Sequence, residues 1–150
     1  DITPLLSHGP ALRAAVDQLA AQYKGKVDTV LGIESRGFLF GAALAYTLGV
    51  GITVVRKPGK LPWKTASVEY DLEYGSDALE IHTDALSESK RVLIVDDLLA
   101  TGGTASAAAQ LVEQLGGQVV ACAFIIELTA LPGRERLQPH PVSSLIQYDD

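Results

Sequence analysis

The sequence predicts an α/β fold in which a central parallel sheet is flanked by helices. Short aliphatic runs, of which residues 92–95 are the clearest, are typical of strands that are buried on both faces. These runs alternate along the chain with amphipathic or alanine-rich segments that are typical of helices. Alternation of this kind indicates parallel strands joined by right-handed crossovers. The 150 residues suffice for one such domain, which we expect to span 1–150.

The first expected helix covers residues 10–22, where Leu12, Val16 and Leu19 share a face and Pro10 lies in the first turn. Small residues make a second helix over 37–48, which Gly49 ends. Further helices are expected at 105–115 and, as a single turn, at 134–137. Strands are expected at 27–33, 52–56, 79–81, 92–96, 118–126 and 143–147.

Composition excludes several classes of protein. The net charge of −6 argues against non-specific binding to nucleic acid or anionic lipid, and no apolar run is long enough to cross a membrane. The three histidines are far apart and lack the spacing of zinc ligands. The only cysteine, Cys122, stands in an apolar run and reads as a core residue, so a reducing cytoplasm is the expected compartment.

A candidate phosphate site follows the strand at 92–96. The acids Asp96 and Asp97 precede a turn of small residues, 100–104, which opens an alanine-rich helix. Gly102 and Gly103 allow positive φ and close approach of a ligand, while amides of the turn and of the helix start attract anions. The missing lysine excludes the nucleotide-triphosphate loop. The two carboxylates suit ribose hydroxyls and a divalent cation better than they suit phosphate.

Two further loops should lie beside this site, because ligands of open parallel sheets bind beyond the carboxyl ends of the strands. Residues 32–37 carry Arg36, whose guanidinium can bind phosphate oxygens in pairs. Residues 57–74 form the second loop; at about 18 residues with little periodicity, it is too long for a passive connection. A basic cluster stands at its start, formed by Arg56, Lys57, Lys60 and Lys64.

Residues 92–104 resemble the phosphoribosyl-pyrophosphate (PRPP) signature of type I phosphoribosyltransferases, and VDDLLATGGT is similar to the form found in adenine phosphoribosyltransferases. RKPGKLP at 56–62 and LEYG at 72–75 are similar to motifs of the same family, and the resemblance covers nearly the whole chain. It implies a type I phosphoribosyltransferase-like fold with a flexible catalytic loop. It also implies purine salvage by an Mg²⁺-dependent homodimer that converts adenine and PRPP to AMP and pyrophosphate.

The resemblance also implies roles for single residues. It places the 5′-phosphate on Ala100, Thr101, Gly102, Gly103 and Thr104, and the ribose hydroxyls at Asp96 and Asp97. It assigns the binding of pyrophosphate to Arg36, Arg56, Lys57 and Lys60, and it implies that Mg²⁺ is held mainly through PRPP and water. Glu73 is the expected catalytic residue, on a loop that closes over the substrates with Tyr74, and Leu128 is expected to pack on the purine.

Two more expectations concern the backbone. The resemblance implies a cis peptide bond between Glu34 and Ser35. The chain starts at Asp1 and contains no methionine, which reads as the loss of some N-terminal residues. In the family, residues just before this point form part of a hood over the base.

Two alternatives remain open. A related transferase could act on another base, such as xanthine or orotate, although Glu73 and Tyr74 favour adenine. A PRPP-sensing regulator could keep the binding loop without catalysis, although no DNA-binding domain or basic surface is visible in the sequence. Turnover of PRPP with a panel of bases separates these readings.

Overall fold

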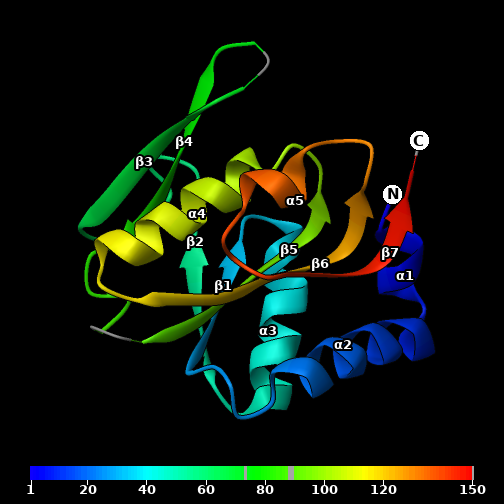
Figure 1. Cartoon of the computed structure of the whole chain (residues 1–150). Coiled ribbons are helices and arrows are strands. Elements are labelled where there is room, and N and C mark those ends of the chain that lie inside the picture. Colours follow the sequence, from blue (N-terminus) through cyan, green and yellow to red (C-terminus); the bar gives the residue numbers. More distant parts are fainter. Residues whose placement is uncertain (73, 88–89, 150) are drawn as a thin grey trace.

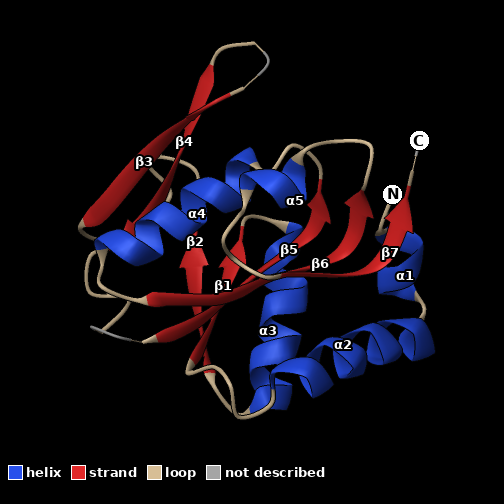
Figure 2. Ribbon diagram, viewed as in Figure 1, coloured by secondary structure: helices blue, strands red, loops and turns tan. Residues whose placement is uncertain are grey.

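The computed structural model describes residues 1–72, 74–87 and 90–149. Its centre is a five-stranded sheet in which every pairing is parallel, as predicted (Figures 1 and 2). The order across the sheet is β2 (Gly51–Val55), β1 (Thr29–Ile33), β5 (Arg91–Leu99), β6 (Gln118–Leu128) and β7 (Val142–Tyr148). The strand with the predicted phosphate signature, β5, therefore lies in the middle of the sheet.

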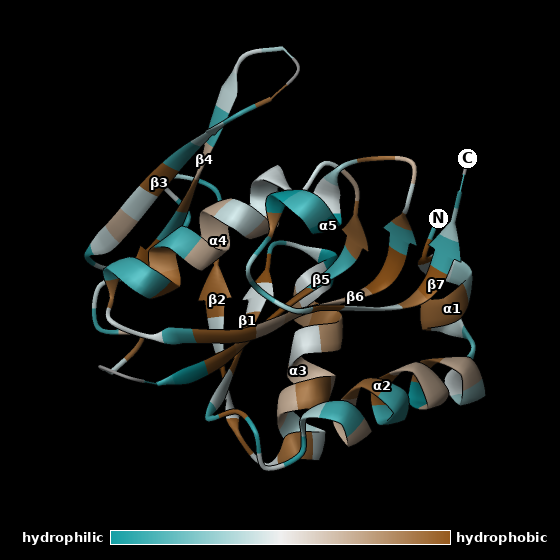
Figure 3. Cartoon of the chain, in the orientation of Figure 1, coloured by the Kyte–Doolittle hydropathy of each residue, from teal (hydrophilic) through white to brown (hydrophobic). Residues whose placement is uncertain are grey.

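Helices cover both faces of this sheet. One face carries α1 (Thr3–Ser7), α2 (Gly9–Tyr23) and α3 (Arg36–Leu48), and the other carries α4 (Gly103–Gln114) and the short α5 (Gly133–Arg136). Alternate residues of β5 supply the two cores: Leu93 and Val95 pack towards α2 and α3, and Val92 and Ile94 pack towards α4. Figure 3 shows apolar residues along the central strands and a mixture of polar and apolar residues along α2 and α4.

The expectation of one long loop over residues 57–74 was wrong. Most of its second half is β3 (Thr65–Asp71), which pairs antiparallel with β4 (Ser76–His82) in a separate two-stranded hairpin that extends beyond the main sheet (Figure 1). Val68 and Tyr70 of β3 are buried against α4, whereas the alternating residues Ser67, Glu69 and Asp71 are exposed. The strand expected at 79–81 lies in this hairpin rather than in the parallel sheet.

The other elements begin and end within a few residues of their predicted bounds, with two exceptions. The helix α1 was not predicted, although Pro4 at its start is a usual helix signal. The strand β5 continues through both acids to Leu99 instead of ending at Asp96. Both carboxylates are therefore fixed by the sheet ladder rather than by a turn.

No helix among the described residues is long and apolar enough to span a membrane. Cys122 is fully buried in β6, and burial raises the pKa of its thiol to about 12. The thiol is therefore protonated and inert, in agreement with its interpretation as a core residue.

Candidate active site

The predicted phosphate turn lies between the end of β5 and the start of α4. Gly102, with φ of 85°, is the N-cap residue of α4, and its carbonyl accepts the Ser106 amide at 2.9 Å. This φ requires glycine, and a Cβ there would also lie 2.9 Å from the Gly133 carbonyl oxygen. The turn lines a small pocket of about 90 Å³ whose walls are Asp96, Leu98–Ala105 and Phe124. Its size suits one phosphate group.

The two acids face different cavities, because successive residues of a strand point to opposite sides. Asp96 lines the small phosphate pocket, whereas Asp97 lines a larger cavity beside it. Burial, reinforced by the nearby Asp97 carboxylate, raises the pKa of Asp96 to about 8. The Asp97 amide donates to Oδ1 of Asp96 at 2.9 Å. Asp96 is thus protonated in part at neutral pH, before any ligand binds.

Arg36 joins the acid pair from the start of α3. Its Nε donates to Oδ2 of Asp97 at 2.6 Å, and Asp97 is buried while the Arg36 side chain is half exposed. Glycine is required at Gly37, where a Cβ would lie 2.9 Å from the carbonyl oxygen of Val95. The peptide bond between Glu34 and Ser35 is cis, as expected. The loops at 32–37 and 96–104 therefore meet, as predicted.

The carboxylate of Glu34 contacts three residues of the basic segment that follows β2. It accepts the Lys57 amide at 2.9 Å and the ammonium of Lys60, and Nε of Arg56 lies 3.4 Å away. This Arg56 nitrogen is buried and makes no hydrogen bond, so its contact with Glu34 is an ion pair alone. Burial would raise the pKa of Glu34, but the hydrogen bonds from Lys60 and Lys57 and the nearby Arg56 cation outweigh it and lower that pKa.

Lys57 points the other way, into the hairpin. Its ammonium contacts the Asp77 carboxylate and donates to the Tyr70 hydroxyl at 2.8 Å. The cations at Arg36, Arg56, Lys57 and Lys60 thus all contact carboxylates. Lys64, by contrast, lies over the Trp63 ring at 5.8 Å and away from this group of ion pairs.

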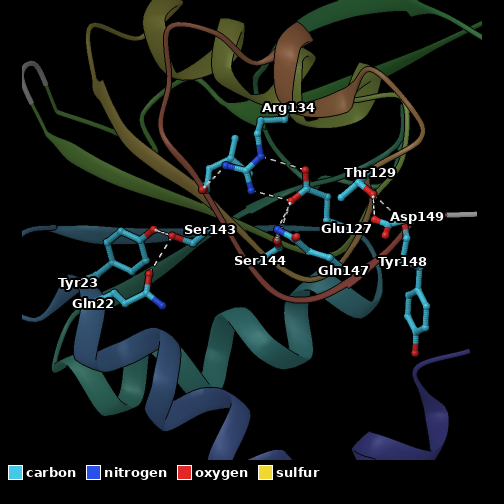
Figure 4. Close-up of polar contacts among 11 residues, drawn as sticks. Gln22, Tyr23, Glu127, Thr129, Arg134, Ser143, Ser144, Gln147, Tyr148 and Asp149 are labelled. Atoms are coloured by element: carbon cyan, nitrogen blue, oxygen red, sulfur yellow. Dashed lines mark hydrogen bonds and ion pairs between the residues drawn. The ribbon is translucent and has the colours of Figure 1, made fainter.

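An apolar cavity of about 490 Å³ adjoins the acid pair. Its lining comes from the N-terminal residues, from the start of α3 and from β5, β6 and β7: Asp1, Ile2, Thr3, Arg36, Asp97, Leu98, Ile126, Leu128 and Tyr148. Figure 4 shows the Tyr148 ring projecting from β7 on the side of α1. A mostly apolar lining that also contains an arginine and a carboxylate suits a heteroaromatic base. Leu128 lines this cavity, where the sequence analysis expects a purine.

Tyr74, at the tip of the hairpin, lies outside this site. Tyr74 is 89% exposed and lines neither the phosphate pocket nor the apolar cavity. Glu73 lies outside the described residues. The other predicted residues come together around the ends of β1, β2, β5 and β6, so the structure assembles most of the predicted site without Tyr74.

Sequence reasoning missed several residues of this site, among them Glu34, Asp77 and Tyr148. Glu34 could have been found, because an acid inside a loop expected to bind pyrophosphate needs cations around it. Asp77 and Tyr148 carry no such signal, since their places depend on the hairpin pairing and on the register of β7. Among the described residues, no cluster of three or more His, Cys, Asp or Glu is arranged to hold a metal.

Comparison with known proteins agrees with this geometry. The family model described as "Phosphoribosyl transferase domain" matches residues 5–146. The adenine phosphoribosyltransferase of a Roseiflexus species is 59% identical over 149 residues, which cover 99% of this chain and 87% of that protein. The adenine phosphoribosyltransferase of Clostridium perfringens is 60% identical over 150 residues, with the same coverage.

The same likeness holds for solved structures. The crystal structure of adenine phosphoribosyltransferase from Thermoanaerobacter pseudethanolicus is 56% identical, with a TM-score of 0.96, and the match covers 99% of this chain and 87% of that one. These sequence and structural matches include every helix and strand that lines the site. The chain therefore belongs to the phosphoribosyl transferase domain family and, within it, to the adenine phosphoribosyltransferases.

Proposed function

We propose that this chain, as one phosphoribosyltransferase domain over residues 1–150, acts in purine salvage by transferring the 5-phosphoribosyl group of PRPP to adenine. The products are AMP and pyrophosphate. One observation carries the proposal: the phosphate pocket and the apolar cavity meet at the end of β5, where Leu98 lines both. A ligand with its phosphate in one and its base in the other has its ribose beside Asp96 and Asp97. AMP has this shape.

The reaction takes place at C1 of the ribose. The bond from C1 to the diphosphate oxygen breaks and its electron pair leaves with the diphosphate, while a purine ring nitrogen donates its own pair to C1. The proton of that nitrogen passes to a base or to water. Positive charge gathers on the ribose in an oxocarbenium-like transition state, so catalysis rests on positioning and electrostatics.

The departing diphosphate needs positive charge, which Arg36, Arg56, Lys57 and Lys60 can supply once it replaces their carboxylate partners. Mg²⁺ held mainly through PRPP and water would add further positive charge at the diphosphate. The hard oxygens of Asp96 and Asp97 suit a place near that ion. Arg36 lines the apolar cavity beside Asp97, so it can meet the diphosphate next to the base.

The hairpin is the part that must move for Glu73 and Tyr74 to act. With Tyr74 at an exposed tip, closure of the hairpin over the substrates would bring both residues to the base and exclude water. We assign Glu73 the handling of the purine proton or the stabilisation of positive charge. Lys57 ties the start of the segment to Asp77 and Tyr70 of the hairpin, so diphosphate binding and hairpin position are connected through it.

We also propose that the protein works as a homodimer in the cytoplasm. Leu39 and Tyr46 of α3 and Ile52 of the edge strand β2 are exposed apolar side chains at 55%, 89% and 38%. A second copy of the chain would cover them, and the family suggests that Arg56 reaches the neighbouring subunit. Light scattering of the wild type and of Tyr46→Asp tests this: a dimer that becomes a monomer is expected.

The activity is tested by pyrophosphate release from PRPP with adenine, hypoxanthine, xanthine and orotate. Adenine alone should support rapid release, with AMP as the product. Rapid release with another base would identify a related transferase, and PRPP binding without release would identify a regulator.

Glu73→Gln tests the catalytic assignment, and Glu69→Gln is the matched control because Glu69 is an exposed acid on the same hairpin. Loss of turnover by about tenfold to a hundredfold is expected in Glu73→Gln alone, with PRPP binding retained. Equal turnover in the two variants would remove Glu73 from the mechanism.

A further inference from the structure

The short helix α5 is fixed firmly against the phosphate loop. A Cβ on Gly133 would lie 2.4 Å from the Ala100 carbonyl oxygen and 2.7 Å from the Leu99 side chain, so the two backbones are in direct contact. The next residue, Arg134, binds the buried Glu127 of β6 through two nitrogens, at 2.6 and 3.0 Å (Figure 4). Leu137, just past the helix, is 1% exposed. The position of α5 relative to the loop is thus set by the backbone contact with the loop and by the ion pair with β6.

The last residue of α5 brings a cation to that loop. Nη1 and Cζ of Arg136 lie 3.4 and 3.7 Å from the place of a Cβ on Gly103, and Cβ of Arg136 lies 3.4 Å from that of Gly102. The side chain lines a cavity of about 600 Å³ together with Thr101, Gly103 and Thr104. Among the residues that the structure describes, it pairs with no carboxylate, unlike Arg134.

Charge at the loop explains why a cation there is useful. A phosphate monoester carries about −1.5 to −2 charges at neutral pH, whereas the loop offers neutral amides and hydroxyls. The nearest titratable neighbour on the pocket side is Asp96, which repels a phosphate when ionised. The cations Arg36, Arg56, Lys57 and Lys60 are each already paired with a carboxylate, that of Asp97, Glu34 or Asp77.

We propose that Arg136 is a specificity residue for the 5′-phosphate, binding it with a guanidinium from the solvent side while the amides of residues 101–104 bind it from the loop. This inference rests on the proposed function and deepens it. It divides the cations between the two ends of PRPP: Arg136 recognises the monoester, and the cations that follow β1 and β2 recognise the diphosphate. Gly103 leaves the space through which the guanidinium reaches the loop.

The same cavity offers a different partner for Arg136, because Tyr70, Asp71 and Leu72 of the hairpin also line it. A contact with Asp71 would make Arg136 a support for the hairpin rather than a phosphate ligand. The two roles differ in one measurable respect. Replacing Arg136 changes the affinity for ribose 5-phosphate only if Arg136 binds the phosphate, because ribose 5-phosphate has neither a diphosphate nor a base for the hairpin to cover.

The experiment compares the wild type with Arg136→Ala, Arg136→Lys and the control Arg13→Ala. Arg13 is an exposed arginine on α2 that pairs with Asp17 at 3.9 Å. Calorimetry measures the affinities for ribose 5-phosphate and for pyrophosphate, and steady-state kinetics give KM and kcat with PRPP and adenine. AMP formation by the wild type tests the proposed function; the ratios between variants test the role of Arg136.

In Arg136→Ala, the dissociation constant of ribose 5-phosphate and the KM for PRPP should each rise by about tenfold or more, with pyrophosphate affinity and kcat within about twofold of the wild type. Arg136→Lys should recover part of the loss, and Arg13→Ala should lose nothing. Unchanged ribose 5-phosphate binding in Arg136→Ala overturns the proposal. Equal losses for ribose 5-phosphate and pyrophosphate overturn it as well, because they show no preference for the monoester.

Discussion

Nε of Arg36 lies 2.6 Å from Oδ2 of Asp97, a residue 61 positions further along the chain. The pair joins the loop after β1 to the acids at the end of β5, in the middle strand of the sheet. Asp97 is buried and Arg36 is half exposed, so the cation can turn towards a ligand more easily than the carboxylate can. Arg36 must exchange this partner for pyrophosphate if it is to act as proposed.

That exchange leads to a first prediction. Arg36→Gln should weaken pyrophosphate binding by about tenfold to a hundredfold, the usual worth of a charge-assisted hydrogen bond, and should leave ribose 5-phosphate binding unchanged. Calorimetry with the two ligands measures both effects. Arg13→Ala is again the control for a lost surface charge. Loss of ribose 5-phosphate binding on the same scale would mean that Arg36 supports the whole site and not the diphosphate end.

The raised pKa of Asp96 predicts that PRPP binding releases a proton. With a pKa of about 8, the free protein holds a proton on Asp96 at pH 7, and ribose hydroxyls and Mg²⁺ favour the ionised form. The dissociation constant of PRPP should therefore fall as pH rises from 7 towards 8 and should level off above that pH. Calorimetry at pH 7.5 in buffers of different ionisation enthalpy counts the proton. Asp96→Asn should bind without this release, and equal release in the two proteins would exclude Asp96 as its source.

The sequence predicts the parallel sheet and the phosphate turn because both depend on local patterns: the apolar run of β5 and the glycines that follow it. The hairpin was missed although a local pattern was present. Ala66, Val68 and Tyr70 alternate with Ser67, Glu69 and Asp71, which is the period of a half-buried strand. The prolines and glycine before this stretch concealed it, because they are typical of loops.

The ion pairs of Lys57 and Arg36 could not have been predicted, for a different reason. Lys57 was expected to face pyrophosphate, and it lies against Asp77 and Tyr70 of the hairpin. Partners so far apart in the sequence are chosen by tertiary packing, and nothing in the residue types distinguishes Asp77 from the other acids nearby. The same holds for the Arg36 contact with Asp97.

Close packing of α5 against the phosphate loop predicts that Gly133→Ala is destabilising. The added methyl would meet a carbonyl oxygen at 2.4 Å, and neither backbone can move without moving the loop. We expect a loss of about 1–3 kcal/mol in the free energy of unfolding, with weaker ribose 5-phosphate binding. Gly9→Ala is the matched control, since a Cβ there has nothing within 4 Å. Equal free energies of unfolding of the two variants in urea would show that α5 can shift to make room for the methyl group.

The Glu127 carboxylate predicts a stability that depends on pH. Hydrogen bonds from Arg134, opposed by burial and aided by Ser144, lower the pKa of Glu127. The stability that ionised Glu127 contributes to the fold is therefore complete above the pKa of glutamate in the unfolded chain, about 4.3. It is lost as pH falls through the lower pKa of Glu127 in the folded protein. Glu127→Gln should be less stable than the wild type by about 1.5–3 kcal/mol at pH 7, and the difference should shrink at pH 3.

Denaturant titrations of the wild type and of Glu127→Gln at the two pH values measure that difference. Glu113→Gln provides the control, since Glu113 is an exposed acid on α4 whose contact is the His140 ring. A difference for Glu127→Gln that is as large at pH 3 as at pH 7 would assign its effect to packing rather than to charge.

The location of the sugar phosphate is the claim on which the account depends most. A crystal structure of this chain with Mg²⁺ and PRPP should show the 5′-phosphate on the amides of residues 101–104, the ribose hydroxyls at Asp96 and Asp97, and the diphosphate beside Arg36. An empty turn at 101–104, with PRPP bound in any other cavity, would contradict it.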